Sequence, residues 1–212
     1  MTVLLTGFEP YGGMPSNPAS ATAIALDGRT IAGHRIRGME LPVSMTRVRQ
    51  LLGELIDELR PKAIICLGLF PGEPVIRIER VGLNIADFAL ADNEGVTIAD
   101  KPVQANGPAA RMSTLPIREI ERALLRQGTP ARISQTAGTY LCNACLYSVL
   151  DLAGAIPAGF IHVPLTPDLV ALRVSQANPD ALERDPPPSM ELSRIVAAVE
   201  TAIAVSLGPA TA

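Results

Sequence analysis

Cys142 is the residue best suited to nucleophilic chemistry, because it stands at the predicted start of a helix over Cys142–Leu152. The N-terminus of a helix carries a partial positive charge, which favours the thiolate form of a cysteine there. The first N–H groups of a helix also lack intrahelical acceptors, so they could hold an oxyanion. The alternative interpretation is a small core residue, since free cysteines are commonly buried.

A thiol nucleophile needs a base, and the chain contains 2 histidines, His34 and His162. His34 falls in a predicted loop or at the exposed start of a strand. His162 lies near the C-terminal end of Gly159–Val163, an apolar run that predicts a buried strand. A buried histidine needs a hydrogen-bond partner, so His162 is either a satisfied core residue or the base, and it is the better candidate of the two.

A carboxylate could orient that base, and Glu79 is one candidate. It lies in Pro74–Arg80, an alternating run that we expect to form an edge or hairpin strand. Glu79 could instead be an exposed strand residue paired with Arg77 or Arg80. Nothing local separates it from the other acidic residues nearby, which are Asp87, Asp92 and Glu94.

Cys142 and Cys145 also form a CxxC pair, which at the start of a helix is typical of thioredoxin-like redox sites. Such a pair usually follows an early strand of a smaller domain, whereas this one lies two-thirds along the chain. A zinc site assembled from Cys66, Cys142, Cys145 and His162 is a further alternative. Structural zinc sites, however, normally show two paired clusters of ligands.

Aromatic residues are scarce, with 4 Phe, 3 Tyr and no Trp, and Phe8 and Tyr11 stand close together in a predicted loop. The loop is rich in Gly and Pro and follows a predicted strand over Thr2–Thr6. These rings could pack the loop onto the core. Alternatively they could form a flat apolar slot for a small ring, since Gly12 and Gly13 permit close approach.

Composition excludes several classes of function. The chain has 212 residues, of which 48% are hydrophobic and 18% charged, with a net charge of −3. We expect no nucleic-acid partner and no membrane association, because no basic patch and no apolar run of membrane-spanning length is present. No P-loop, GxGxxG or HExxH motif occurs. An odd count of 3 cysteines and no recognisable signal peptide favour a reducing, cytoplasmic location.

Strand and helix signals alternate along the chain, which favours an α/β fold with a largely parallel sheet and helices on both faces. We expect one domain over residues 1–212. Its buried strands are predicted at Thr2–Thr6, Ala63–Leu67 and Gly159–Val163, and its helices at Pro18–Leu26, Thr46–Leu59, Cys142–Leu152 and Met190–Leu207, with another inside Pro108–Arg126. Ligands of such folds bind beyond the C-terminal ends of the strands.

Several blocks of the sequence resemble the pyroglutamyl peptidase I (pyrrolidone-carboxylate peptidase) family of cysteine peptidases. The blocks follow family order over nearly the whole chain: TGFEPYGG (6–13), IERV (78–81), DNEG (92–95), STLPI (113–117), AGTYLCN (137–143), GFIHVP (159–164) and PPSM (187–190). The resemblance therefore carries expectations about fold, activity and site residues.

The resemblance implies a peptidase that removes N-terminal pyroglutamyl (5-oxoproline) residues from small peptides through an acyl-enzyme. Its nucleophile, base and orienting acid match Cys142, His162 and Glu79. Its substrate-binding residues match Phe8, Tyr11 and Leu141. The family also implies a twisted α/β/α sandwich, a cytoplasmic homotetramer, and neither cofactor nor metal.

This sequence departs from the family pattern at a few positions. Tyr11 stands where the family usually has Phe, Ala89 where it has Arg, and Leu165 where it has Tyr, and Cys145 is not typical of the family. None of these changes removes a candidate catalytic residue. The missing charge at Ala89 leaves one alternative, a protein that binds pyroglutamyl ligands without turnover.

Overall fold

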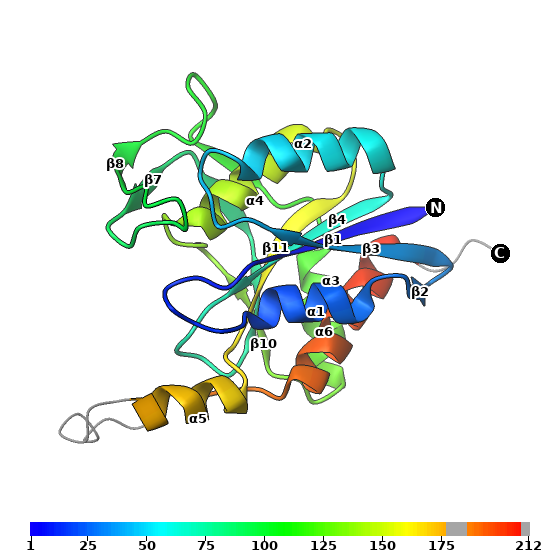
Figure 1. Ribbon diagram of the computed structural model, residues 1–212. Coiled ribbons are helices and arrows are strands. Elements are labelled where there is room, and N and C mark those ends of the chain that lie inside the picture. The colour runs from blue at the N-terminus through cyan, green and yellow to red at the C-terminus, as the bar shows by residue number, and fades with distance from the viewer. Residues whose placement is uncertain (177–185, 209–212) are drawn as a thin grey trace.

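A seven-stranded sheet with helices on both faces forms the core of the computed structural model, which describes residues 1–176 and 186–208 (Figure 1). The strand order is β10-β5-β11-β4-β1-β3-β2. The strands are β1 (Thr2–Phe8), β2 (Thr30–Ile31), β3 (His34–Leu41), β4 (Ala63–Leu69), β5 (Ile76–Glu79), β10 (Ala131–Ser134) and β11 (Ala158–Val163). The predicted α/β architecture is confirmed.

The middle of the sheet is parallel, since β1 pairs in parallel with β3 and β4, and β4 with β11. At one end β2 folds back as an antiparallel hairpin onto β3. At the other end β5 runs antiparallel to β11 and parallel to β10. The prediction of an edge or hairpin strand over Pro74–Arg80 is therefore wrong, because β5 lies between two neighbours and all four of its residues are buried.

The helices form two layers (Figure 1). One face of the sheet is covered by α1 (Pro18–Leu26), α3 (Ile117–Arg126) and α6 (Leu192–Leu207), and the other by α2 (Val48–Leu59) and α4 (Leu141–Leu152). The remaining helix that the structure describes, α5 (Pro167–Gln176), packs at the carboxyl end of β4, where Leu69 contacts Leu169 and Val170. In residues 1–176 and 186–208, no helix combines the length and the apolar character that crossing a bilayer requires.

Two small antiparallel pairs lie outside the main sheet. They join β6 (Val81–Leu83) to β9 (Ala110–Met112) and β7 (Ala86–Phe88) to β8 (Ile98–Lys101). The sequence analysis predicted neither these pairs nor β2 and α5. Strands of two to four residues are too short to show a period, which explains the omission of the strands.

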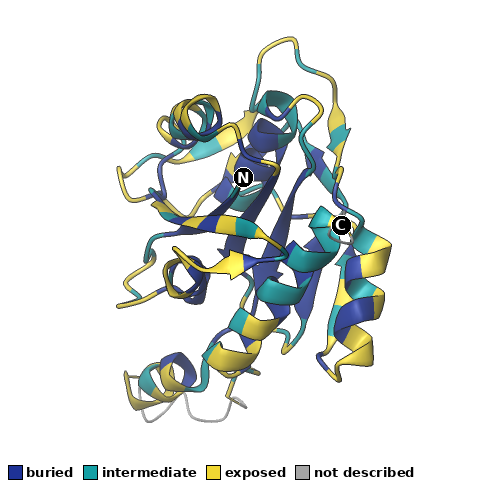
Figure 2. Cartoon of the chain, turned by 90° about the vertical axis from the view of Figure 1, so that its right-hand side faces the viewer, coloured by how far each residue is buried: buried dark blue, intermediate teal, exposed yellow. Residues whose placement is uncertain are grey.

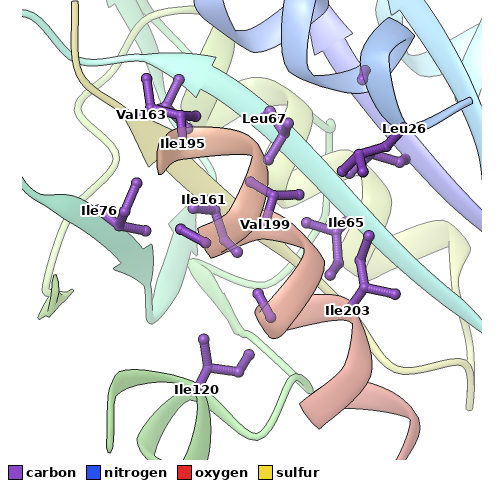
Figure 3. Close-up of a cluster of buried hydrophobic side chains, with 14 of the residues drawn as sticks. Leu26, Ile65, Leu67, Ile76, Ile120, Ile161, Val163, Ile195, Val199 and Ile203 are labelled. Atoms are coloured by element: carbon purple, nitrogen blue, oxygen red, sulfur yellow. The ribbon is translucent and has the colours of Figure 1, made fainter. Parts of the chain in front are cut away.

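The central strands of the sheet are buried on both sides, as their dark blue colour in Figure 2 shows. Alternate residues of each strand enter different core clusters, with Ile65 and Ile161 facing α6 and Ile64 and Phe160 facing α4. Figure 3 shows the first cluster, in which α6 places Ile195, Val199 and Ile203 against the strands. This explains why the central strands read as unbroken apolar runs.

Asn17 caps α1 and fixes the Gly/Pro-rich loop at the end of β1. The side chain of Asn17 accepts a hydrogen bond from Ala19 N at 3.0 Å, with Pro18 in the first turn. The helix then passes so close to β1 that a Cβ on Gly7 would lie 2.2 Å from Ala19 O. Glycine at position 7 thus allows the loop carrying Tyr11 to leave the strand beneath α1.

Candidate active site

Cys142 lies in the first turn of α4, which begins at Leu141, one residue earlier than predicted. Gly138, with φ of 77°, provides the left-handed turn that brings the chain into the helix. The N–H groups of Asn143 and Ala144 both donate to Tyr140 O. The predicted position of the thiol at a helix N-terminus is therefore confirmed.

The next residue, Asn143, ties this helix end to the last residue of β6 and to the segment that follows it. Its side chain accepts from Leu83 N at 2.8 Å and donates to Leu83 O at 2.9 Å and to Ile85 O at 2.8 Å. Asn143 is fully buried, so these bonds replace water that the amide would otherwise bind. The position of Cys142 is thus fixed by its neighbour in the chain.

His162 and Glu79 form a buried pair. His162 Nδ1 lies 2.8 Å from Glu79 Oε1, and the two side chains are 2% and 0% exposed. The contact joins the antiparallel neighbours β11 and β5, in which His162 faces Arg77 across the ladder. The alternative of an exposed Glu79 is excluded, although the pairing with Arg77 that it included is present, with Arg77 Nε 3.3 Å from the same Oε1.

The other acidic and imidazole groups have different partners. Asp92 accepts bonds from Met45 N, Glu94 N and Val96 N. His34 lies at the start of β3, as the sequence suggested, and its Nδ1 is 2.9 Å from Ala32 O. Of the acids considered from the sequence, Glu79 is therefore the one that contacts His162.

Gly68 brings the Cys142 sulfur to the strand beside His162. In the parallel ladder Gly68 of β4 pairs with His162 of β11. A Cβ at Gly68 would lie 2.8 Å from Cys142 Sγ and 2.6 Å from Phe160 Cζ, so the sulfur occupies the space that a side chain would fill. Sequence reasoning missed Gly68, because a glycine in an apolar strand carries no signal of what lies above it.

The expected thiolate is not what the resting site favours. Burial, and to a lesser extent the charge of Glu79, raise the pKa of Cys142 to about 12, although the residue's own backbone N–H lowers it slightly. Desolvation therefore outweighs the effect of the helix dipole on the pKa of Cys142. The dipole was the only influence on this pKa that the sequence indicated. The protonated thiol is therefore the favoured form of Cys142 at neutral pH.

Aromatic rings lie in the same cluster as Cys142. The Tyr140 ring lies 5.9 Å from the Tyr11 ring and packs edge-on against Phe88 at 4.9 Å. Burial is the main cause that raises the pKa of Tyr11 well above its usual range. Burial, followed by the charge of Asp92, raises the pKa of Tyr140 to about 12, and in both tyrosines a Cys142 thiolate is a smaller cause. The sequence analysis did not single out Tyr140 or Phe88, although the scarcity of aromatic residues was a usable signal for both.

The three residues expected to bind substrate differ in exposure. Phe8 and Leu141 are buried in the core cluster below α2 and α4, whereas Tyr11 is half-buried at its margin. Leu165, one of the departures from the family pattern, is buried beside Leu69 and α5, and Ala89 is exposed. Tyr11 is thus the most accessible of the three.

One carboxylate joins three distant loops around these rings. Glu9 Oε1 accepts from Val43 N at 2.9 Å and from Asn93 Nδ2 at 2.8 Å. Nearby, Glu94 Oε2 accepts from the hydroxyls of Ser44 and Thr46. The acidic residues of the GFEP and DNEG blocks therefore hold the loops beside the site in position.

The redox and zinc alternatives receive no support from the structure. Cys145 is fully buried and shares a hydrogen bond with the buried thiol of Cys66, while Cys142 alone is partly exposed. Among the described residues, no group of three or more His, Cys, Asp or Glu side chains is arranged to hold a metal ion.

Comparison with known proteins agrees with this geometry. The profile of the family described as pyroglutamyl peptidase matches residues 1–208. A pyrrolidone-carboxylate peptidase of Chromobacterium violaceum is 43% identical over 206 residues, which cover 97% of this chain and 92% of the relative. One from Bacillus cereus is 41% identical over 209 residues, with the same coverage.

Solved structures show the same fold. A mutant pyrrolidone carboxyl peptidase from P. furiosus superposes with a TM-score of 0.91 at 37% identity, covering 98% of both chains. The pyrrolidone carboxyl peptidase from Thermococcus litoralis gives 0.89 at 40% identity, covering 97% of this chain and 93% of that one. On the profile match, the curated relatives and the shared fold, the chain belongs to the pyroglutamyl peptidase family.

Proposed function

We propose that this chain is a thiol exopeptidase that hydrolyses the amide bond after an N-terminal pyroglutamyl residue, through Cys142, His162 and Glu79. The observation that carries the proposal is the buried 2.8 Å contact between His162 Nδ1 and Glu79 Oε1. It lies on the strand next to Gly68, against which the Cys142 sulfur packs. The names of the relatives in the family supply the pyroglutamyl substrate.

In this proposal His162 acts as the general base. Glu79 accepts a hydrogen bond from Nδ1–H, which holds the ring proton on Nδ1 and leaves Nε2 free to take the proton of the Cys142 thiol. Because the pKa of that thiol is raised to about 12, its proton passes to Nε2 as the sulfur attacks the acyl carbonyl carbon of the scissile amide. The imidazolium then protonates the departing amine, and the neutral imidazole activates the water that releases pyroglutamate and restores the thiol.

The first turn of α4 would stabilise the oxyanion. The N–H groups of Leu141 and Cys142 have no acceptor within the helix, whereas those of Asn143 and Ala144 donate to Tyr140 O. An oxyanion-hole donor typically contributes about 3–4 kcal/mol to transition-state stabilisation. The bonds of Asn143 to the segment after β6 would keep these donors in place.

The pyroglutamyl ring would lie among apolar and aromatic groups. Tyr11 and Tyr140 would form the wall, and the buried Phe8 and Leu141 the floor beneath it. A lactam is neutral and has no α-ammonium group, so it requires no buried acid, and the ring centroids of Tyr11 and Tyr140 are 5.9 Å apart. The hydroxyl of Tyr11 would distinguish this slot from one lined by phenylalanine.

The remaining expectations stand as proposals from the same resemblance. They are a single peptidase domain over residues 1–212, a homotetrameric assembly, a cytoplasmic location, and activity without a cofactor or metal. Small peptides with an N-terminal pyroglutamate are the proposed partners, and nucleic acid and membranes are not.

The test is a reporter assay with two matched substrates, pyroglutamyl-aminomethylcoumarin and prolyl-aminomethylcoumarin, which differ by the lactam carbonyl. We expect rapid release from the first, negligible release from the second, and loss of activity after treatment with iodoacetamide. Activity that survives complete alkylation of Cys142 would contradict a thiol mechanism. Tight binding of a pyroglutamyl ligand without turnover would instead indicate a binding protein.

A further inference from the structure

Arg77 is a buried cation whose guanidinium is fixed on every side. Its side chain is 7% exposed. Nε donates to Glu79 Oε1 at 3.3 Å, and Nη2 donates to Ser134 Oγ at 2.7 Å and to Thr136 O at 3.0 Å. Nη1 lies 3.4 Å from Glu73 Oε1. The cation is therefore held in one orientation, with one edge directed at the acid of the proposed triad.

Arg77 also acts on the proposed base, His162, through the ring of Phe70. Its Cζ lies 3.7 Å from the centroid of the Phe70 ring, a stacking distance for a guanidinium. The Phe70 ring packs against the imidazole of His162, with centroids 5.6 Å apart. In the ladder Arg77 directly faces His162. One side chain thus contacts the acid and supports the ring that packs on the base.

The carboxylate of Glu79 has few other restraints. Oε1 accepts from Arg77 and His162, while Oε2 is buried and has no partner in the described part of the chain. A buried carboxylate is costly unless it is paired. Arg77 is therefore the group that makes a charged Glu79 tolerable in a site without solvent.

We propose that Arg77 is a positioning residue of this site, which keeps Glu79 a carboxylate oriented on His162 and leaves the imidazole free to accept the thiol proton. This inference rests on the proposed function. Arg77 would act through Glu79 and Phe70 and would touch neither substrate nor the reacting atoms.

The sign of the effect follows from the charges around Glu79. The charged and titratable groups that face it directly are Arg77 of β5, His162 of β11 and Cys142 of α4, while Glu73 and Arg132 of β10 lie behind Arg77. With Arg77 present, the carboxylate is balanced without a proton. If the cation is removed, the Glu79–His162 pair retains one proton to higher pH, whichever of the two carries it. That proton blocks the base.

The experiment compares Arg77→Met, Arg77→Gln and Arg77→Lys with the wild-type chain, using kcat/KM for pyroglutamyl-aminomethylcoumarin as a function of pH. The neutral variants should move the acidic limb of the profile up by about 1 pH unit and lower the plateau by roughly 100-fold. Arg77→Lys should return the limb close to its wild-type position, because it restores the charge. Its plateau should stay low, because lysine lacks the planar fork that bonds Glu79 and stacks on Phe70.

Arg132→Met is the matched control. Arg132 pairs with Glu73 on the outer side of the same cluster and does not contact Glu79. Its profile should match that of the wild type. Folding of each variant is checked by circular dichroism and thermal unfolding, so a loss of structure is distinguished from a shift in pH dependence.

An unmoved acidic limb in folded Arg77→Met and Arg77→Gln, with Arg77→Lys no better than either, would overturn the inference and leave Arg77 a purely structural residue. An inactive wild-type chain would instead overturn the proposed function, so the two failures are distinguishable.

If the neutral variants do not fold, the wild-type site can be tested by NMR. The chain has 2 histidines, so His34→Gln leaves His162 as the single imidazole to observe. We expect the Nδ1 proton of His162 to give a downfield resonance that marks its hydrogen bond to Glu79, and Arg77→Lys to weaken that resonance. An unchanged resonance in folded Arg77→Lys would show that Arg77 does not position Glu79, and would overturn the inference.

Discussion

On the face of the sheet covered by α1, α3 and α6, the buried cluster (Figure 3) contains neither aromatic residues nor cysteines among residues 1–176 and 186–208. On the face covered by α2 and α4, the cluster includes Phe8, Phe88, Phe160, Cys66 and Cys145. The same strands supply both, since Ile161 and Val163 of β11 face the first while Phe160 faces the second. One face therefore stabilises the fold, and the other also carries the proposed site.

The polar groups of the site follow the same division. In β5, Ile76 and Ile78 enter the aliphatic cluster. The alternate residues, Arg77 and Glu79, form a buried polar network with His162. The period of two in a strand is what allows adjacent residues to serve such different roles. The comparison teaches that substitutions on the two faces should separate activity from stability.

The largest effect on activity should come from Cys142→Ala, which removes the proposed nucleophile at the edge of the chemical face. We expect kcat/KM for the pyroglutamyl reporter to fall by on the order of 10³-fold or more, with little change in thermal unfolding. Cys145→Ala is the matched control, because Cys145 lies in the same helix but is buried against Cys66. Equal losses in the two variants would favour the CxxC interpretation.

His162→Ala should reduce turnover nearly as much, because members of a triad act as a unit. The variant also tests the thiol. Burial raises the pKa of Cys142 to about 12, so the thiolate fraction is small at pH 7 and grows as the pH rises. Alkylation of Cys142 by iodoacetamide, followed by peptide mass spectrometry, should therefore keep accelerating towards pH 12.

A half-maximal alkylation rate near pH 8.5 in His162→Ala would contradict the raised pKa. His34→Ala serves as the control for loss of an imidazole, since His34 lies at the start of β3, where its Nδ1 is 2.9 Å from Ala32 O. It should leave both turnover and alkylation unchanged.

Gly68→Ala should have an intermediate effect, because its Cβ would lie 2.8 Å from Cys142 Sγ and push the sulfur from its place. A displacement of the reacting sulfur by about 1 Å should lower kcat/KM by roughly 100-fold. Gly53→Ala in α2 is the matched control, since a Cβ there meets nothing within 4 Å and alanine favours the helix. Wild-type activity in Gly68→Ala would show that the sulfur does not depend on this gap.

The smallest effect on activity should come from the aliphatic face. Ile203→Ala opens a cavity between α6 and the sheet, at a fully buried position labelled in Figure 3. We expect the free energy of unfolding to fall by about 2–5 kcal/mol in a urea titration, with kcat/KM within twofold of wild type. A tenfold loss of activity in the folded variant would show that the two faces are not separable.

The sequence predicts the layers of the fold and the candidate triad residues. It predicts the contacts among those residues less well. Long helices such as α2 show their period, and the cap at Asn17 is visible in the residue types. The scarcity of histidine singles out His162 without any structure. Membership in the family, which the resemblance predicted, is confirmed.

What the sequence could not predict depends on tertiary neighbours. The inner position of β5 follows from its antiparallel pairing with β11, which no local pattern encodes. The raised pKa of Cys142 depends on burial by segments far away in the chain. The roles of Gly68 and Arg77 depend on the side chains that pack on them, which the sequence does not show. The local pattern of Pro74–Arg80 left an exposed Glu79 as an alternative. The assignment of roles to Glu79, Cys142 and His162 stays a prediction.

The bonds of Glu9 have a consequence for how the molecule reaches its working state. They join residues 34 and 84 positions away, and the His162–Glu79 contact spans 83. Closing such long loops costs chain entropy that local helix formation does not. Helices such as α2 can therefore form early during refolding, while catalytic competence returns only when the last of these distant segments has docked.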